Sequence, residues 1–415
     1  MSQTSSPSPV SLPAKAFRFF SSFGFATVIL VFLLLITLLG TLEQVEHGLF
    51  ASQKKYFDGL FVPNIDMACC LRAMHVQYQG SWLLPLPLPG AALLMVLLFI
   101  NMVCGGLIRI RKGVRNIGVI ISHISILWML LAGFVSFQWK KDGNMALYEG
   151  QTSDEFQSYH DSVIEIERID PAPKDGKRKA LVIDGGEYED LTDGKARTFT
   201  SKDLPFDLMV INYEVNCEPK RATAEQKWAA DGYFLQRVEK RQEAEMNLDG
   251  TYIKVVDKKS KQEQTGLAWR AAAAPLSFKI GDETYAIDLT RRRWKLPFAL
   301  RLEKFEREVH PGTDRARKFT SRATKITNGH EEKKIITMNA PVRDGGYILF
   351  QASFSQDRGA NGPMRSVFAV VSNPSDKWPE YACYLAIFGL LLHLIIRATL
   401  FSRRKGSKLS APSAA

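Results

Sequence analysis

An apolar stretch, FGFATVILVFLLLITLLGTL (residues 23–42), runs for twenty residues without a charged side chain. A helix of this length crosses the roughly 30 Å hydrocarbon core of a lipid bilayer. Three further uncharged apolar runs follow at residues 90–108, 117–137 and 381–396. The sequence therefore predicts a membrane protein with four transmembrane α-helices.

The net charge of +11 is concentrated in three segments that contain no acidic residue. Residues 1–23, 109–116 and 397–415 hold two, four and five basic residues, which together account for the whole net charge. Because the rest of the chain balances, the composition gives no case for a nucleic-acid surface. An even number of spans separates the three segments, and the positive-inside rule places all of them in the cytoplasm.

This topology divides the chain into alternating inner and outer parts. The expected segments are a cytoplasmic N-terminus (1–22), a first span (23–42), an outer loop (43–89), a second span (90–108), a cytoplasmic turn (109–116), a third span (117–137), an extracytoplasmic domain (138–380), a fourth span (381–396) and a cytoplasmic tail (397–415). The first run follows Lys15 and Arg18 and could also be a signal peptide. Its length and the lack of a clear cleavage site favour an uncleaved anchor.

The extracytoplasmic domain contains short alternating or β-rich stretches between Gly, Asp and Pro turns, which is typical of antiparallel β-structure. The clearest stretches are residues 162–166, 206–215, 252–256, 276–280, 285–289 and 346–354. Leu204-Pro205-Phe206 and Leu296-Pro297-Phe298 each open a predicted strand, which indicates either a weak duplication into two β layers or a chance likeness. Residues 220–247 fit a helix or a charged excursion equally well.

Histidines inside the predicted spans are the clearest chemical signal. An ionisable side chain is costly in hydrocarbon, so His123 and His393 are candidates for a functional site. At 1.5 Å per residue both lie roughly 6–9 Å from the cytoplasmic boundary. Imidazole is a common axial ligand of haem iron, and an apolar porphyrin suits a groove between helices. The alternative is a hydrogen bond that packs one helix on another. His75 is a weaker candidate for haem contact, since its outer loop also holds Tyr78 and Trp82.

Six motifs occur in order along the chain. They are Gly40-Thr41-x-x-Gln44, Phe99-Ile100-Asn101-Met102-Val103-Cys104, Gly118-x4-His123-Ile124-Ser125, Asn144-Met145-Ala146-Leu147-Tyr148-Glu149-Gly150, Leu296-Pro297-Phe298, and Asn339-Ala340-Pro341 followed by Gly346-Tyr347-Ile348-Leu349-Phe350-Gln351-Ala352-Ser353. With this topology, the set resembles the ResB (CcsB) family of the System II cytochrome c biogenesis pathway. Residues 220–270 align to no part of that family's pattern.

The resemblance implies a subunit that carries reduced haem b across the bacterial inner membrane and supports its thioether attachment to apocytochrome c. His123 is the matching position for a transmembrane haem ligand. The family's WWD haem segment belongs to the partner, a ResC/CcsA-type membrane subunit, and this chain has no such run. The chain would then be part of a cytochrome c haem lyase complex and not catalytic alone, with that subunit, apocytochrome c, haem and membrane lipid as its partners.

Two other classes of protein stay open. One is a membrane sensor with the outer domain as ligand detector, although the short cytoplasmic parts offer no output domain. The other is a quinol-linked haem redox subunit that uses His123 and His393 as a bis-imidazole pair. A soluble enzyme is disfavoured, since no nucleophile–base or metal constellation occurs. The five cysteines form no CxxC pair, and a redox role for Cys69 and Cys70 stays undecided.

Overall fold

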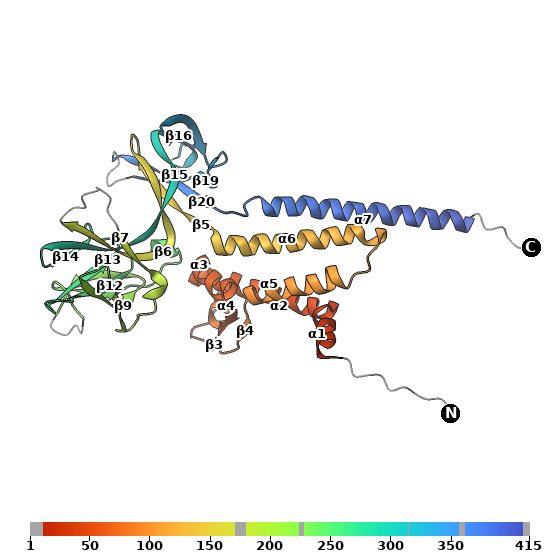
Figure 1. Ribbon diagram of the computed structural model, residues 1–415, viewed down its shortest axis with the longest axis horizontal. Helices are drawn as coiled ribbons and strands as arrows, with labels where there is room; N and C mark the ends of the chain where they lie inside the picture. Colours follow the sequence, from red (N-terminus) through yellow and green to blue (C-terminus); the bar gives the residue numbers. More distant parts are fainter. Residues whose placement is uncertain (1–10, 171–179, 224–227, 314, 357–361, 410–415) are drawn as a thin grey trace, which may run out of the picture. The chain divides into compact units, whose positions relative to one another are not determined.

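The computed structural model describes residues 11–170, 180–223, 228–313, 315–356 and 362–409 (Figure 1). The chain separates into two compact units, a helical unit (Met1–Lys140 with Asn373–Ala415) and a β unit (Lys141–Ser372). The predicted cytoplasmic ends extend into residues 1–10 and 410–415, which lie outside the described residues. The predicted fold class, transmembrane helices plus a large antiparallel β region, is confirmed.

The helical unit contains the predicted spans. Its elements are α1 (Leu12–Phe20), α2 (Phe23–His47), α3 (Leu49–Gln53), the π-helical η1 (Lys54–Asp58), α4 (Met67–Ala73), α5 (Ala91–Asn101), the π-helical η2 (Met102–Ile108), the 3-10 turn η3 (Val114–Asn116), α6 (Ile117–Trp139) and α7 (Trp378–Leu409), with two short strand pairs, β1 (Phe61–Val62) with β4 (Leu88–Pro89) and β2 (Ile65–Asp66) with β3 (Leu83–Leu84). Within the described residues, four helical stretches are long and apolar enough to cross a membrane: Phe23–His47, Ala91–Ile108, Val114–Trp139 and Trp378–Leu400. The protein is therefore a multi-pass membrane protein.

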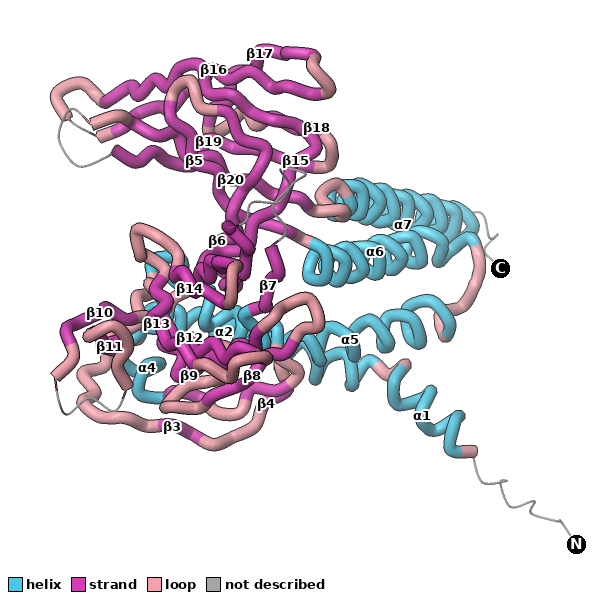
Figure 2. Tube along the Cα trace, turned by 60° about the vertical axis from the view of Figure 1, so that its left-hand side comes forward, coloured by secondary structure: helices cyan, strands magenta, loops and turns pink. Residues whose placement is uncertain are grey.

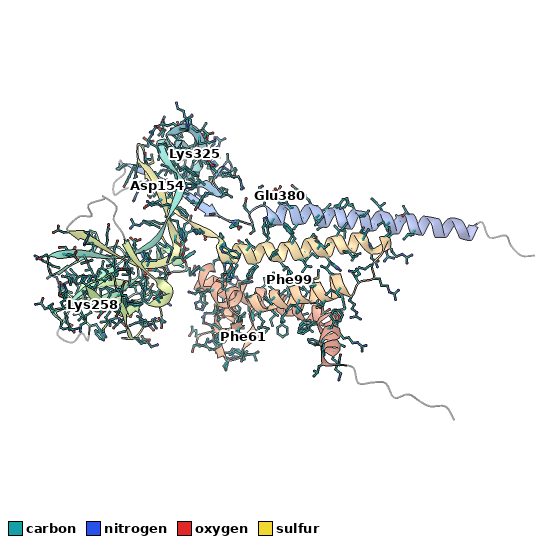
Figure 3. The ribbon with its side chains drawn as sticks, in the orientation of Figure 1. Phe61, Phe99, Asp154, Lys258, Lys325 and Glu380 are labelled. Atoms are coloured by element: carbon teal, nitrogen blue, oxygen red, sulfur yellow. The ribbon has the colours of Figure 1, made fainter. Side chains whose placement is uncertain are left out.

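Apolar side chains cover the outer surfaces of these helices. Leu34 of α2 is 71% exposed, Leu394 of α7 is 58% exposed, and Phe99 projects from α5 (Figure 3). Such surfaces are unfavourable in water and favourable against lipid chains. The exposure of these side chains thus agrees with the membrane assignment made from the apolar runs.

The chain folds back on itself at the end of α2. Ser22 caps the start of α2, where its Oγ accepts a hydrogen bond from the Phe25 N–H at 3.2 Å. Gly48 ends the helix at a φ of +79°, and its N–H donates to the Gln44 carbonyl. Only glycine adopts that backbone conformation without strain. The segment after Gly48 consequently runs back along α2 and buries Tyr56 in one apolar cluster with Ile36.

The β unit is built from antiparallel strands (Figure 2). Their bounds are β5 (Lys141–Tyr148), β6 (Thr152–Asp170), β7 (Ala180–Asp184), β8 (Ala196–Thr200), β9 (Phe206–Glu214), β10 (Cys217–Arg221), β11 (Tyr233–Arg237), β12 (Gly250–Asp257), β13 (Glu263–Trp269), β14 (Leu276–Ile280), β15 (Glu283–Val309), β16 (Ala316–Thr327), β17 (His330–Thr337), β18 (Val342–Asp344), β19 (Tyr347–Gln356) and β20 (Met364–Ser372), with 3-10 turns η4 (Gly185–Glu187) and η5 (Ala244–Met246). The larger sheet has the order β17-β16-β15-β6-β5-β20-β19-β18, with β14 on β15 and β7 on β6. A four-stranded sheet has the order β13-β12-β9-β8, and β10 pairs with β11.

Two apolar cores occupy the β unit. One lies between the four-stranded sheet and part of the larger sheet, with Phe206, Ile253 and Ile287 at its centre. The other lies within the larger sheet around Leu300 and Phe368. The long strands β6 and β15 contribute to both cores, because they have 19 and 27 residues.

The structure decides two expectations about this unit. Phe206 opens β9 as predicted, but Pro297 lies inside β15, where the pairing with β6 shifts register between Lys295 and Leu300. A proline lacks the N–H that a ladder requires, so it is tolerated at such an irregularity. The expectation that both Leu-Pro-Phe motifs open a strand is therefore wrong. In the described part of residues 220–247, β10 ends at Arg221 and β11 and η5 follow, and residues 224–227 lie outside it.

Candidate functional site

His123 lies on α6, at the seventh residue of that helix, and its ring is half-buried against η2. Its Nδ1 is 2.9 Å from the carbonyl oxygen of Gly106. A carbonyl only accepts, so in this bond Nδ1 carries the hydrogen and donates it. Nε2 then holds the lone pair, and it makes no hydrogen bond within the part of the chain that the structure describes.

Gly106 makes this contact possible because it has no side chain. A Cβ at that position would lie 2.9 Å from the Nδ1 of His123, closer than normal packing allows. The residue belongs to the π-helical turn η2, and π-helical turns are frequent at functional sites because they shift which backbone groups are turned outward. The position of the His123 ring therefore depends on both the glycine and the π-helical turn.

His393 lies on α7, which runs beside α6 (Figures 1 and 2). The two helices approach through small residues: a Cβ on Gly118 would lie 2.5 Å from the Gly389 carbonyl oxygen and 2.6 Å from the His393 nitrogen. Close backbone approach of this kind is the usual packing mode of membrane helices. The Nδ1 of His393 is buried and has no hydrogen-bond partner among the described residues. The backbone of the turn that carries His393 thus packs on α6 just before His123.

His75 lies at the other end of the helical unit. Asn101, near the end of α5, donates to the Phe20 carbonyl at 2.7 Å, so η2 and His123 lie near the start of α2. The thiol of Cys69 on α4 contacts the Glu43 carbonyl at 3.8 Å, so the loop that follows α4 lies near the end of α2. His75 is exposed there, in a left-handed conformation with a φ of +62°. The structure does not bring His75 and His123 together.

A buried carboxylate, Glu43, was missed by the sequence reasoning. It is 1% exposed and accepts from the Lys55 ammonium at 2.8 Å, from the Tyr56 hydroxyl at 2.5 Å and from the Asp66 N–H at 2.9 Å. Burial, followed by the bond to Glu43, raises the pKa of Tyr56 far above its ordinary value. The one sequence signal was an acidic residue directly after an apolar run, which reads as an ordinary membrane boundary.

One group of metal-type side chains lies close to Glu43 within the described residues. Ligand atoms of Glu46, His47 and Cys69 all lie within 4.8 Å of one another. Both Glu46 oxygens are 2.6 Å from the guanidinium of Arg72, and burial, aided by Glu46 and Asp66, raises the pKa of the Cys69 thiol to about 12. A carboxylate already paired with arginine and a protonated thiol are poor metal ligands. This group therefore acts as an ion-pair network that ties α4 to α2.

The motif around Gln351 has a structural role in the β unit. Gly345 and Gly346 have φ values of +56° and +80° and form the turn from β18 to β19. Gln351 is 2% exposed, and its Oε1 accepts from the hydroxyls of Ser321 and Ser366. The side chains of this motif thus satisfy buried polar groups between β16, β19 and β20, and they present no reactive group.

The same region carries the likeness to known proteins. Residues 276–369, from β14 into β20, match the ResB-like family. No curated protein matches the chain. The chain is therefore a multi-pass membrane protein whose residues 276–369 match the ResB-like family.

Proposed function

We propose that this protein handles haem during cytochrome c biogenesis and that His123 supplies one axial ligand to the haem iron. The observation that carries the proposal is the hydrogen bond from Nδ1 to the Gly106 carbonyl, which leaves Nε2 as the nitrogen with a lone pair. Histidines that bind metals usually donate their other ring N–H to a carbonyl or carboxylate, because that bond fixes the tautomer and the ring orientation. A neutral imidazole in apolar surroundings is a suitable ligand for iron.

The other parts of the proposal follow from the same chemistry. One imidazole leaves the second axial position to another group, which we assign to a ResC/CcsA-type partner subunit. The haem is cargo that is passed on to apocytochrome c, so the chain is one component of a haem lyase complex. The basic segments support a cytoplasmic N-terminus, with the β unit and His75 on the outer face of a bacterial inner membrane.

The test compares His123→Ala with His330→Ala, an exposed histidine of β17 in the β unit. In the complex purified with its partner, His123→Ala is expected to lower bound haem, read as Soret absorbance, by roughly tenfold or more, because a coordinate bond to iron is lost. External imidazole should restore part of the absorbance, and c-type cytochromes should fall in cells that carry the variant. Normal haem content together with normal c-type cytochromes in His123→Ala would overturn the assignment.

A second candidate function rests on the buried Nδ1 of His393, which has no hydrogen-bond partner within the residues that the structure describes. A haem redox subunit would use His123 and His393 together as a bis-imidazole pair. The chain expressed without any partner would then hold haem with a six-coordinate spectrum, and His393→Ala would abolish that spectrum. For the biogenesis function, haem is expected only when the partner is present.

A further inference from the structure

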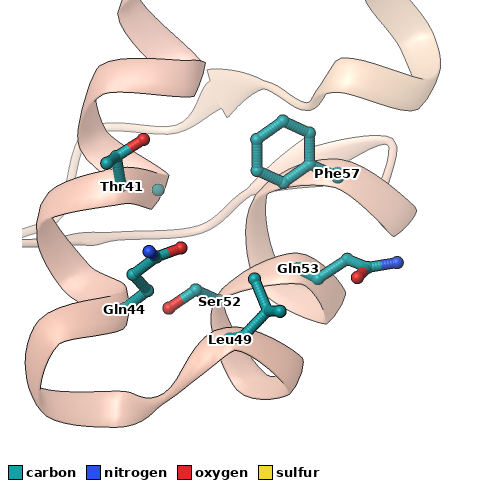
Figure 4. Close-up of a pocket in the computed structure, with 7 residues that line it drawn as sticks. Thr41, Gln44, Leu49, Ser52, Gln53 and Phe57 are labelled. Carbon is teal, nitrogen blue, oxygen red and sulfur yellow. The ribbon is translucent and has the colours of Figure 1, made fainter. Parts of the chain in front are cut away.

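A pocket of about 350 Å³ lies between the end of α2 and the segment that runs back along it, within the helical unit (Figure 4). Every residue that lines it is uncharged: Gly40, Thr41, Gln44, Leu49, Ser52, Gln53 and Phe57. The apolar run of α2 ends here, so the pocket lies at the level where a membrane span meets the bilayer surface. It is distinct from the surroundings of His123, which lies near the start of α2.

Ser52 is the most buried of the polar residues that line this pocket. The residue is 3% exposed, and its hydroxyl has no hydrogen-bond partner in the described part of the chain. A buried hydroxyl without a partner is unfavourable and needs an explanation in a folded protein. Gln44 also makes no side-chain hydrogen bond within the described residues. Figure 4 shows the side chains of Ser52 and Gln44 beside one another, whereas the Gln53 amide points away.

The walls of the pocket are apolar and aromatic. Phe57 lies against Gly40, where an added Cβ would be 3.0 Å from the ring. The carboxylate that is nearest to Gln44 in the sequence, Glu43, already accepts hydrogen bonds from Lys55, Tyr56 and the Asp66 N–H. An ionic head group therefore finds no counter-charge among the lining residues, whereas a neutral oxygen finds two donors beside an aromatic ring. A largely apolar pocket with a few placed polar groups is the usual form of a small-molecule site.

We propose that this pocket binds the oxygen-bearing head of a neutral membrane amphiphile. The Ser52 hydroxyl and the Gln44 amide would donate to its carbonyl or ester oxygen, and Phe57 and Leu49 would pack against its apolar part. A quinone ring and a diacylglycerol ester are the two sources of this chemistry. The proposal does not depend on haem binding by His123.

The test uses the full chain in nanodiscs, with two probes titrated separately by calorimetry: a short-chain benzoquinone and dioctanoylglycerol. Ser52→Ala and Gln44→Leu are each expected to raise the Kd of the probe by roughly tenfold, which is the effect of one lost hydrogen bond to a desolvated group. Thr27→Val is the control, because this hydroxyl lies on the same helix as Gln44 and, among the described residues, bonds only to the Phe23 carbonyl. Ser52→Ala is expected to fold normally, since no bond within the protein is removed.

Binding of either probe with that pattern of variants supports the proposal and identifies the source. The proposal fails if neither probe binds, or if Ser52→Ala and Gln44→Leu bind both probes as tightly as Thr27→Val does. Haem content is measured in parallel on the same variants purified together with the partner subunit. A loss of probe binding with haem retained separates this pocket from the proposed role of His123.

Discussion

Glu43 is an unusual residue to find at the end of a membrane span, because a buried charge is stable only when its partners are in place. Its carboxylate is shared by Lys55, Tyr56 and the Asp66 N–H, which come from η1 and from β2. One side chain therefore joins α2, η1 and β2 at one end of the helical unit. Its removal leaves an ammonium and a buried hydroxyl without their acceptor.

Glu43→Ala is expected to destabilise the helical unit by about 2–4 kcal/mol, since the loss of one partner of a buried, hydrogen-bonded ion pair is costly. Glu46→Ala is the matched control: it lies one turn away on the same helix, and its pair with Arg72 is more exposed. An exposed pair contributes roughly 0–1 kcal/mol. The loss of stability in each variant is measured as the change in apparent Tm, read from the tryptophan fluorescence of the full chain in detergent. Equal losses in the two variants would contradict the central role of Glu43.

At the scale of elements, the contact between α6 and α7 depends on glycine. A Cβ at Gly118 would reach backbone atoms of Gly389 and His393, and backbone cannot move aside as a flexible side chain can. Gly118→Ala is therefore expected to push the helices apart and cost about 1–3 kcal/mol, as overpacking usually does. The variant should also bind less haem, because Ser122, which directly precedes His123, packs in the same contact.

Gly133→Ala supplies the control on the same helix. A Cβ there meets no atom within 4 Å, so the apparent Tm and the haem content should stay at the level of the unchanged protein. If Gly118→Ala and Gly133→Ala behave alike in thermal unfolding and in Soret absorbance, close packing of α6 on α7 is not what positions the histidines.

The sequence predicts those parts of the fold that depend on local pattern. Twenty uncharged apolar residues suffice to identify a span, and alternation suffices to identify β-structure around residues such as Ile164 or Ile287, which lie in β6 and β15. Pairings over long distances are not predictable in this way. The acceptor for His123 is the Gly106 carbonyl because η2 is π-helical. No residue pattern predicts a π-helical turn. The network of Glu43 likewise forms only when the chain folds back after Gly48.

At the scale of the whole molecule, the ResB-like match does not coincide with a separate folding unit. Residues 276–369 include β15 and most of β20, but β15 pairs with β6 and β20 pairs with β5, both outside the matched residues. The matched region therefore depends on residues 141–170 for its hydrogen bonds and for part of each core. Function on the outer face would then belong to the β unit as one body and not to the matched stretch alone.

The expected orientation of the whole chain rests on its charge distribution. Three basic segments without acids are separated by even numbers of spans, so a single topology satisfies the positive-inside rule for all of them. The β unit, Lys141–Ser372, is then expected on the outer face. It carries many Lys and Arg residues, such as Lys258 and Lys261, which are sites for trypsin. Trypsin added to intact spheroplasts should consequently digest the β unit, whereas inverted membrane vesicles should protect it. Protection in spheroplasts and digestion in vesicles would mean the opposite orientation, and would place His123 near the outer boundary of the membrane instead of the cytoplasmic one.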